Sequence, residues 1–178
     1  MRHRVTMMAG VIALAGCAGT PSSGTPACAS ADTPEGAVCG FYTRYLEVRP
    51  TGLPTPEQQA ALAPWLSHSL EDRLDAARQS QARFRTENPG EKPPLVDGCL
   101  FASLFEGPTA FTVEPATAGG SVTRVPVQFR YGTEAAWQDV IVLSREGAGY
   151  VIDDIEFAGA GPFNPPGRLT EALDRAGE

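Results

Sequence analysis

Asp153 is a carboxyl group whose neighbours in the sequence could make it reactive. It belongs to residues 150–157, a segment rich in β-branched and aromatic residues that predicts a β-strand. Alternate residues of a strand share a face, so Asp153 would lie beside Val151 and Ile155. Apolar surroundings favour the neutral form of a carboxyl group, and such a group can act as a general base. Asp153 is therefore the candidate catalytic residue.

A structural role for Asp153 is the alternative interpretation, with its carboxylate hydrogen-bonded to backbone amides or to an arginine such as Arg44. Asp154 and Glu156 fall on the opposite face of the strand and are expected to face solvent. His68 is the only histidine after residue 3, and a Ser-His-Asp or Cys-His site would have to use it. It stands at the start of a predicted helix, where a surface or capping role is expected.

Other familiar catalytic signatures are missing from the sequence. There is no GxSxG, Walker-type, GxGxxG or HExxH pattern. No CxxC or Cys/His spacing indicates a metal site. The sequence therefore favours a non-enzymatic protein that uses no cofactor and no metal ion.

The first sixteen residues have the three parts of a secretory signal peptide. Arg2 and Arg4 form a basic start, residues 5–15 are mostly apolar, and small residues follow. The apolar run is shorter than the roughly twenty residues that a membrane-spanning helix needs. We therefore expect removal of this segment rather than its retention as a transmembrane anchor.

Leu14-Ala15-Gly16-Cys17 resembles the lipobox of bacterial lipoproteins. In that motif the cysteine thiol receives a diacylglyceryl group, the chain is cut just before it, and the new amine is acylated. The resemblance implies a membrane anchor on Cys17, because two or more acyl chains anchor a protein stably. Ala18 follows the cysteine instead of Asp, which by the sorting rule of enteric bacteria favours the outer membrane, facing the periplasm.

The charge of the chain argues against nucleic acid as a partner. The sequence has 14 basic and 21 acidic residues and a net charge of −7, which becomes about −9 if Arg2 and Arg4 are removed. Binding to nucleic acid or to anionic lipid headgroups requires a basic surface.

Three cysteines remain if Cys17 carries lipid, and an exported chain meets an oxidising environment. We expect a disulfide between Cys39 and Cys99, since both stand in segments that are predicted to fold. Cys28 lies in a Pro-rich stretch and could pair with either, and three reduced thiols are a further alternative.

Residues 17–33 predict a lipidated cysteine and a flexible tether, and residues 34–178 a single domain. Apolar residues at helical spacing predict helices from Pro34, with Thr33 as N-cap, over 56–62 and from about 66 to 88. Strands are predicted over 111–115, 122–131, 137–145 and 150–157, and a short helix over 169–176. Helices followed by antiparallel strands predict an α+β fold with the N-terminal helices packed on the sheet.

Several stretches, in this order, resemble a bacterial family of exported proteins, domain of unknown function 3828, which has a nuclear-transport-factor-2-like cone fold. They are Ala37-Val38, Phe41-Tyr42, Tyr45-Leu46, residues 100–109 (LFASLFEGPT), Trp137, residues 140–143 (VIVL) and residues 150–155 (YVIDDI). The last stretch departs from the family at Tyr150, where a Trp is expected. The resemblance implies a curved sheet covered by helices, and it brings no catalytic residues.

Two segments could contact a partner or edge a pocket. In residues 101–109, Phe105 and Glu106 precede a Gly-Pro turn and could form the rim of a pocket. The alternative is that the apolar residues fill the open end of the cone. Phe163 stands in a Gly- and Pro-rich segment, where an exposed aromatic ring could anchor a partner or pack back on the domain.

The sequence thus favours a lipid-anchored envelope protein that binds a protein partner, as an accessory or as an immunity-type protein. A carrier of a small apolar ligand in the cone pocket and an enzyme with Asp153 as general base are the alternatives. The oligomeric state stays open.

Overall fold

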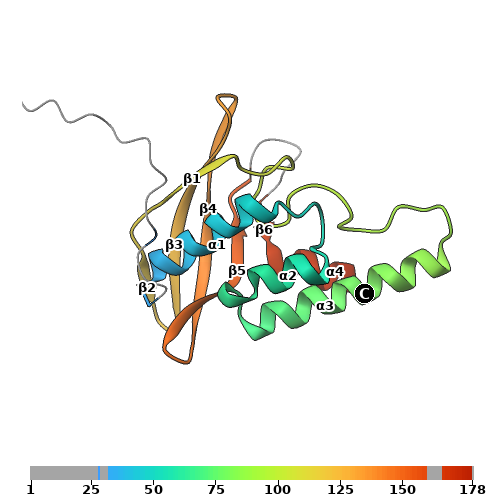
Figure 1. The fold of residues 1–178 in the computed structure, drawn as a ribbon, viewed down its shortest axis with the longest axis horizontal. Helices are drawn as coiled ribbons and strands as arrows, with labels where there is room; N and C mark the ends of the chain where they lie inside the picture. The colour runs from blue at the N-terminus through green and yellow to red at the C-terminus, as the bar shows by residue number, and fades with distance from the viewer. Residues whose placement is uncertain (1–27, 29–31, 160–165, 178) are drawn as a thin grey trace, which may run out of the picture.

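The computed structural model describes Cys28, residues 32–159 and residues 166–177 (Figure 1). Cys17 and Phe163 lie outside the described residues. The elements in chain order are α1 (Pro34–Val48), α2 (Pro56–Leu62), a 3-10 turn (Ala63–Trp65), α3 (His68–Glu87), β1 (Ala110–Val113), β2 (Thr117–Gly119), β3 (Val122–Tyr131), β4 (Ala135–Glu146), β5 (Gly149–Phe157), β6 (Gly167–Arg168) and α4 (Leu169–Gly177).

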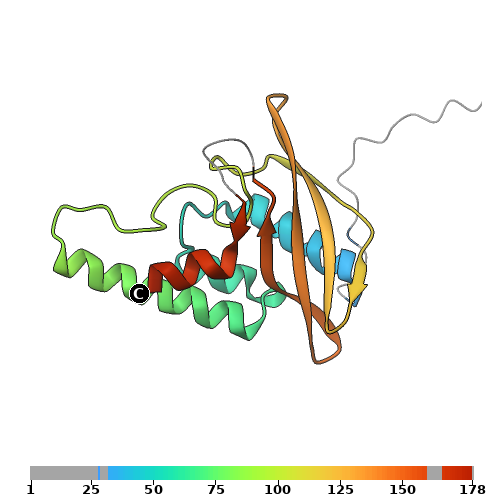
Figure 2. The same ribbon diagram turned by 180° about the vertical axis from the view of Figure 1, so that it is seen from behind.

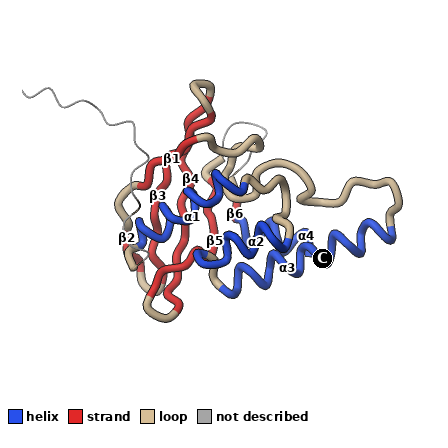
Figure 3. Tube along the Cα trace, in the orientation of Figure 1, coloured by secondary structure: helices blue, strands red, loops and turns tan. Residues whose placement is uncertain are grey.

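The strands form one antiparallel sheet in the order β1-β3-β4-β5-β6, and β2 pairs with the start of β3 (Figure 3). Helix α1 crosses one face of this curved sheet and contacts β1, β3 and β5, while α3 and α4 pack together beside β5 (Figure 1). The predicted α+β fold, with N-terminal helices on a curved antiparallel sheet, is confirmed. β2 and β6, of three and two residues, were not predicted.

Helix α1 begins where its sequence predicts. The Thr33 hydroxyl accepts a hydrogen bond from the backbone N–H of Gly36 at 3.1 Å, and Pro34 occupies the first turn. The apolar stripe is buried against the sheet, with Phe41 and Tyr42 fully inaccessible to solvent. The helix ends at Arg49, which adopts the left-handed conformation (φ 43°), and Pro50 follows.

Aromatic rings fill the space between α1 and the sheet. Tyr42 meets Phe129 of β3 at 4.9 Å between ring centroids, and Phe41 meets Phe101 at 5.4 Å. Tyr42 also donates its hydroxyl to the carbonyl of Phe101 at 2.8 Å. Aromatic burial of this kind contributes both apolar area and directional ring contacts. These side chains therefore occupy the volume in which a cone-shaped fold could hold an apolar ligand.

The prediction that Asp154 faces solvent is wrong. A β-bulge interrupts the pairing of β5 with β4: Asp154 pairs with Val142, whereas Ile152 already pairs with the next residue, Leu143. The extra residue, Asp153, breaks the alternation of faces, so that Ile152 and Ile155 are both buried. Asp154 is 4% exposed and its carboxylate accepts hydrogen bonds from Arg168, at 2.7 Å, and from Thr170.

The predicted pairing of Cys39 with Cys99 is also wrong. The structure joins Cys39 to Cys28, with 5.4 Å between their Cα atoms. Cys99 is a free thiol and contacts Tyr45. Cys39 and Tyr45 are six residues apart on α1, which at 100° per residue points their side chains in different directions. The disulfide therefore fastens the segment before α1 to the helix instead of fastening the later loop.

Helix α3 starts at a cap formed by Ser67, whose hydroxyl accepts from the N–H of Leu70 at 3.0 Å. Its buried residues Leu70, Leu74 and Ala77 recur at helical spacing. Among the described helices, none has the length and apolar character needed to cross a membrane.

Candidate partner-binding surface

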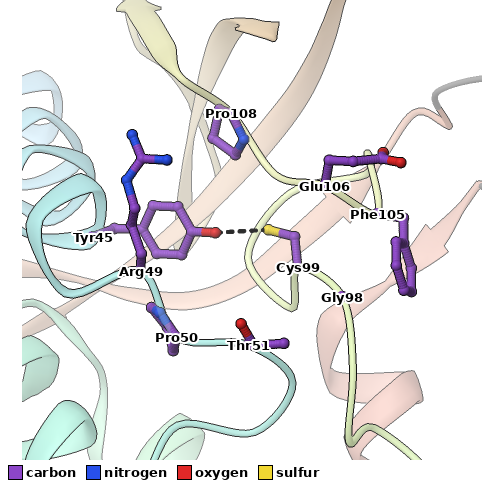
Figure 4. Close-up of a pocket in the computed structure, with 9 residues that line it drawn as sticks. All are labelled: Tyr45, Arg49, Pro50, Thr51, Gly98, Cys99, Phe105, Glu106 and Pro108. Atoms are coloured by element: carbon purple, nitrogen blue, oxygen red, sulfur yellow. Dashed lines mark hydrogen bonds between the residues drawn. The ribbon is translucent and has the colours of Figure 1, made fainter.

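A cavity of about 350 Å³ opens where α1 ends, between that helix and the loop of residues 98–108 (Figure 4). We call this region the α1-end surface; its lining residues are Tyr45, Arg49, Pro50, Thr51, Gly98, Cys99, Phe105, Glu106 and Pro108. Phe105 is 55% exposed, the most exposed large hydrophobic side chain among the described residues. Phe105 and Glu106 are the residues that the sequence proposed for a pocket rim.

Arg49 brings a positive charge to one wall of the cavity. Its backbone N–H donates to the carbonyl of Tyr45 at 2.8 Å and closes α1. Its side-chain Nε donates to the carbonyl of Leu46 at 3.0 Å. In the view of Figure 4, Arg49 and Glu106 stand on opposite sides of the Tyr45–Cys99 pair. The surface thus combines one cation, one anion and an exposed aromatic ring.

Backbone hydrogen bonds hold the loop that carries Phe105 and Glu106. The N–H of Cys99 donates to the carbonyl of Phe105 at 2.7 Å, and the N–H of Gly107 donates to Leu104 at 2.9 Å. Gly98 has a φ of 76°, and a Cβ built on it would stand 2.5 Å from the Phe105 ring. The ring therefore lies directly against the Gly98 backbone, and only glycine fits there.

Tyr45 and Cys99 form the floor of the cavity, with 3.0 Å between the phenol oxygen and the sulfur. Burial raises the pKa of the Tyr45 phenol, and the neighbouring Cys99 raises it further. Burial also raises the pKa of the Cys99 thiol. Because the thiolate is the nucleophilic form of cysteine, a neutral buried thiol is a poor nucleophile. The raised pKa therefore favours the neutral thiol at the floor of the cavity.

Asp139 of β4 anchors the same loop from beneath, and its side chain is fully buried. The carboxylate accepts hydrogen bonds from the Ser103 backbone N–H at 2.8 Å and from the Ser103 hydroxyl. It also accepts from the Trp137 indole at 3.1 Å and from the N–H of Ala158 at 3.1 Å. The first part of the loop is therefore fixed to the sheet, which limits the motion of Phe105.

Asp139 also affects the phenol of Tyr42 on α1. Burial raises the pKa of Tyr42 well above its ordinary value, and the negative charge of Asp139 raises it further. The phenol therefore stays a neutral donor to the Phe101 carbonyl, which ties the same loop to α1. Sheet and helix thus both hold residues 101–103.

Asp153 lies apart from the α1-end surface. Its carboxylate accepts a hydrogen bond from the hydroxyl of Ser67 at 2.7 Å, and Ser67 in turn caps α3. Arg44 pairs with Glu47 instead of Asp153. His68 is exposed and contacts Glu146 at the end of β4. The geometry thus gives Asp153 a contact that positions a helix, although its partner is a serine hydroxyl and not the backbone amides or Arg44 that the structural interpretation named.

Sequence reasoning missed Asp139, Tyr45 and Arg49 as parts of this region. Asp139 has a signal in the sequence, because it shares the strand parity of Trp137 and Ile141, which face the core. The sequence holds no comparable signal for Arg49. Its place on the surface follows from its own left-handed backbone conformation at the end of α1.

No protein-family model matches the chain, and no curated protein matches it. A solved structure that is similar is a chain of the type VI native effector-immunity complex Tae3-Tai3 from Ralstonia pickettii. It has 22% sequence identity and a TM-score of 0.45, and the match covers 70% of this chain and 94% of that chain. Similarity at this level indicates nothing about the partner or the activity of this chain.

Proposed function

We propose that this chain is a non-enzymatic, lipid-anchored envelope protein that binds a protein partner through its α1-end surface. The observation that carries the proposal is the exposed ring of Phe105, beside Glu106 on a loop that Asp139 of the sheet anchors at Ser103. Exposed aromatic anchors in fixed positions are typical of binding hot spots. Such a partner-binding protein would be either an envelope accessory or an immunity-type protein, and the partner of an immunity-type protein would be a toxin.

The position of the surface suits a protein that is anchored by lipid on Cys17. The chain enters the domain at Thr33, and the disulfide with Cys28 fastens the preceding segment to α1. The α1-end surface lies ten residues further along the helix, at Arg49, a distance of about 15 Å from Cys39 along the helix axis. A tether that reaches the domain at Cys28, beside the middle of α1, would leave the surface at the end of the helix free for a partner.

The interior packing does not favour the alternative of an apolar ligand carrier. Tyr42, Phe101 and Phe129 are fully buried, and Tyr42 contacts both of the other two between α1 and the sheet. A ligand in that space would have to displace a close-packed core, which is costly. Partner binding at the surface requires no such rearrangement.

The proposal is tested by crosslinked capture of the full-length protein from its native envelope, with mass spectrometry of the captured proteins. We expect one envelope protein or toxin to be enriched. Phe105→Ala should reduce its capture by about 30-fold, as truncation of a hot-spot side chain costs about 2 kcal/mol. Glu106→Ala should reduce it less, because a charge at the rim of an interface contributes little.

Glu134→Ala is the matched control, since Glu134 is an exposed acidic residue in the turn between β3 and β4. Capture that is equal for Phe105→Ala, Glu106→Ala and Glu134→Ala would refute the assignment of the surface. The anchor is tested separately: Cys17→Ser should leave the chain unlipidated and move it out of the membrane fraction. Retention of the Cys17→Ser chain in that fraction would refute the lipid anchor.

A further inference from the structure

The far end of α3 carries a second recess, distant from the α1-end surface. Helix α4 packs along α3 and ends at Gly177, whereas α3 extends beyond it (Figures 1 and 2). A cavity of about 300 Å³ lies at this point, which we call the α3-end groove. Its lining residues are Ser80, Arg83, Phe84, Glu87, Pro94, Arg175 and Ala176.

One wall of the groove is a single face of α3. Ser80, Arg83, Phe84 and Glu87 are spaced by three, one and three residues, which places them along one stripe of a helix. The opposite wall comes from the end of α4 and from Pro94. Gln81 fixes the position of Pro94 in this wall. The side-chain amide of Gln81 donates to the carbonyl of Pro94 at 2.6 Å, and Gln81 is 5% exposed.

The arginines of this groove differ from most others in the protein. Side-chain partners in the structure are found for Arg44, Arg49, Arg73, Arg78, Arg85, Arg124, Arg145 and Arg168. Within the described part of the chain, the arginines whose side chains have no such partner are Arg83, Arg130 and Arg175. Two of these three line the α3-end groove.

Two unpaired guanidinium groups beside an aromatic ring form a specific chemical environment. Guanidinium groups bind carboxylate and phosphate oxygens through charge-assisted hydrogen bonds. The half-buried ring of Phe84 offers an apolar contact in the same groove. Glu87 also lines the groove, and its negative charge disfavours a ligand with a second anionic group.

We propose that the α3-end groove binds an amphiphilic organic anion. The apolar body of the ligand packs on Phe84, and its one carboxylate or phosphate group pairs with Arg83 and Arg175. This site is independent of the partner-binding function, because it lies on other elements and shares no residue with the α1-end surface.

The test uses the full-length lipidated protein in phosphatidylcholine nanodiscs, with phenylacetate and phenyl phosphate as probes. Binding is measured by saturation-transfer difference NMR titration, and benzyl alcohol is the uncharged control ligand. We expect at least one of the two anions to bind and benzyl alcohol to bind more weakly. The double variant Arg83→Gln, Arg175→Gln should raise the Kd of that anion by about tenfold or more, as each guanidinium forms charge-assisted hydrogen bonds.

Arg130→Gln is the matched control, because Arg130 is also unpaired but lies on β3. It should leave the Kd unchanged, and circular dichroism should show that all variants fold. The stronger of the two probes distinguishes a carboxylate ligand from an organic phosphate. Failure of both anions to bind, or an unchanged Kd in the double variant, would overturn the proposal. Inorganic phosphate that competes as well as phenyl phosphate would also overturn it, because the apolar contact would then contribute nothing.

Discussion

Asp139 and Asp154 are both buried carboxylates on neighbouring strands, but their hydrogen-bond partners differ in kind. Asp139 faces the helix-covered side of the sheet, and its four donors are two backbone N–H groups, a hydroxyl and an indole. Asp154 faces the other side and has a cation, Arg168, together with the N–H and hydroxyl of Thr170 at the start of α4. One is held by neutral donors and the other by an ion pair.

Because their hydrogen-bond partners differ, Asp139 and Asp154 should contribute differently to the stability of the domain. Asp139 is fully buried and accepts from the loop, from β4 and from the residue after β5, so the loop and the sheet depend on one another. Arg168 has a side chain that is 39% exposed and a second carboxylate partner, Glu156. Because Arg168 keeps a second partner, the domain should lose little stability when the Asp154 carboxylate is removed. It should lose more stability when the Asp139 carboxylate is removed.

The largest effect is expected for Asp139→Ala. The substitution removes the acceptor of the buried Trp137 indole and of the partly buried N–H groups of Ser103 and Ala158. Because each unsatisfied buried donor costs about 1–3 kcal/mol, we expect a loss of about 4 kcal/mol of unfolding free energy. Urea denaturation measures this loss.

Asp139→Asn is the matched variant for this measurement. It keeps one oxygen as an acceptor and should lose about half as much stability, since the other oxygen becomes a donor that faces other donors. A change below about 1 kcal/mol in Asp139→Ala would show that the four hydrogen bonds contribute little.

A smaller effect is expected for Asp154→Ala. Thr170 loses the carboxylate that accepts from its N–H in the first turn of α4, and Arg168 keeps Glu156 and gains water. Loss of a helix cap costs about 1 kcal/mol, and loss of a partly exposed charged hydrogen bond adds about as much, so we expect about 2 kcal/mol in urea denaturation. A loss as large as that of Asp139→Ala would remove the contrast between the two regions.

The contrast between Asp139 and Asp154 also shows which features of the structure can be predicted from the sequence. The alternation of residues in β3 and β4 and the Thr33 cap were enough to predict most element bounds, because those signals are local. The same alternation would have placed Asp139 in the core. The bulge at Asp153 could not be predicted, since one inserted residue changes the face of everything after it without a local signature.

The disulfide could not be predicted for a different reason. Its partner depends on which side of α1 each residue faces and on the path of the segment that precedes the helix. Cysteine count and spacing constrain neither of these. Likewise, Phe105 and Glu106 were found as a pair from their loop, but Tyr45 and Arg49 enter the same surface only through the tertiary fold.

The reactivity of the Cys99 thiol should also distinguish the Asp139 region from the Asp154 region. Cys99 is a half-buried residue at the start of the loop that Asp139 holds, and burial raises the pKa of its thiol, so it should react slowly with Ellman's reagent. Asp139→Asn should increase this rate by about tenfold, because a loop that opens more easily by about 1.4 kcal/mol exposes the thiol ten times more often. Mass spectrometry of the peptide that contains Cys99 measures the rate.

Asp154→Asn is the control for thiol reactivity, and it should leave the rate unchanged because its contacts lie on the other side of the sheet. For every variant the rate should rise with pH, since the thiolate is the reactive form and a raised pKa means that little thiolate exists near neutrality. Equal acceleration by both substitutions would mean that the thiol becomes exposed through unfolding of the whole domain.

The smallest effect is the response of the two regions to salt. The pair of Asp154 with Arg168 is partly exposed, so ions should screen it, whereas the neutral donors around Asp139 present no exposed charge pair. In 0.5 M NaCl the destabilisation by Asp154→Asn should shrink by about half a kcal/mol relative to low salt, within the range of exposed ion pairs. The destabilisation by Asp139→Asn should stay the same in paired urea titrations. If salt changed both by the same amount, the ion pair would not be what distinguishes the Asp154 region, and the cap on α4 would have to carry the difference.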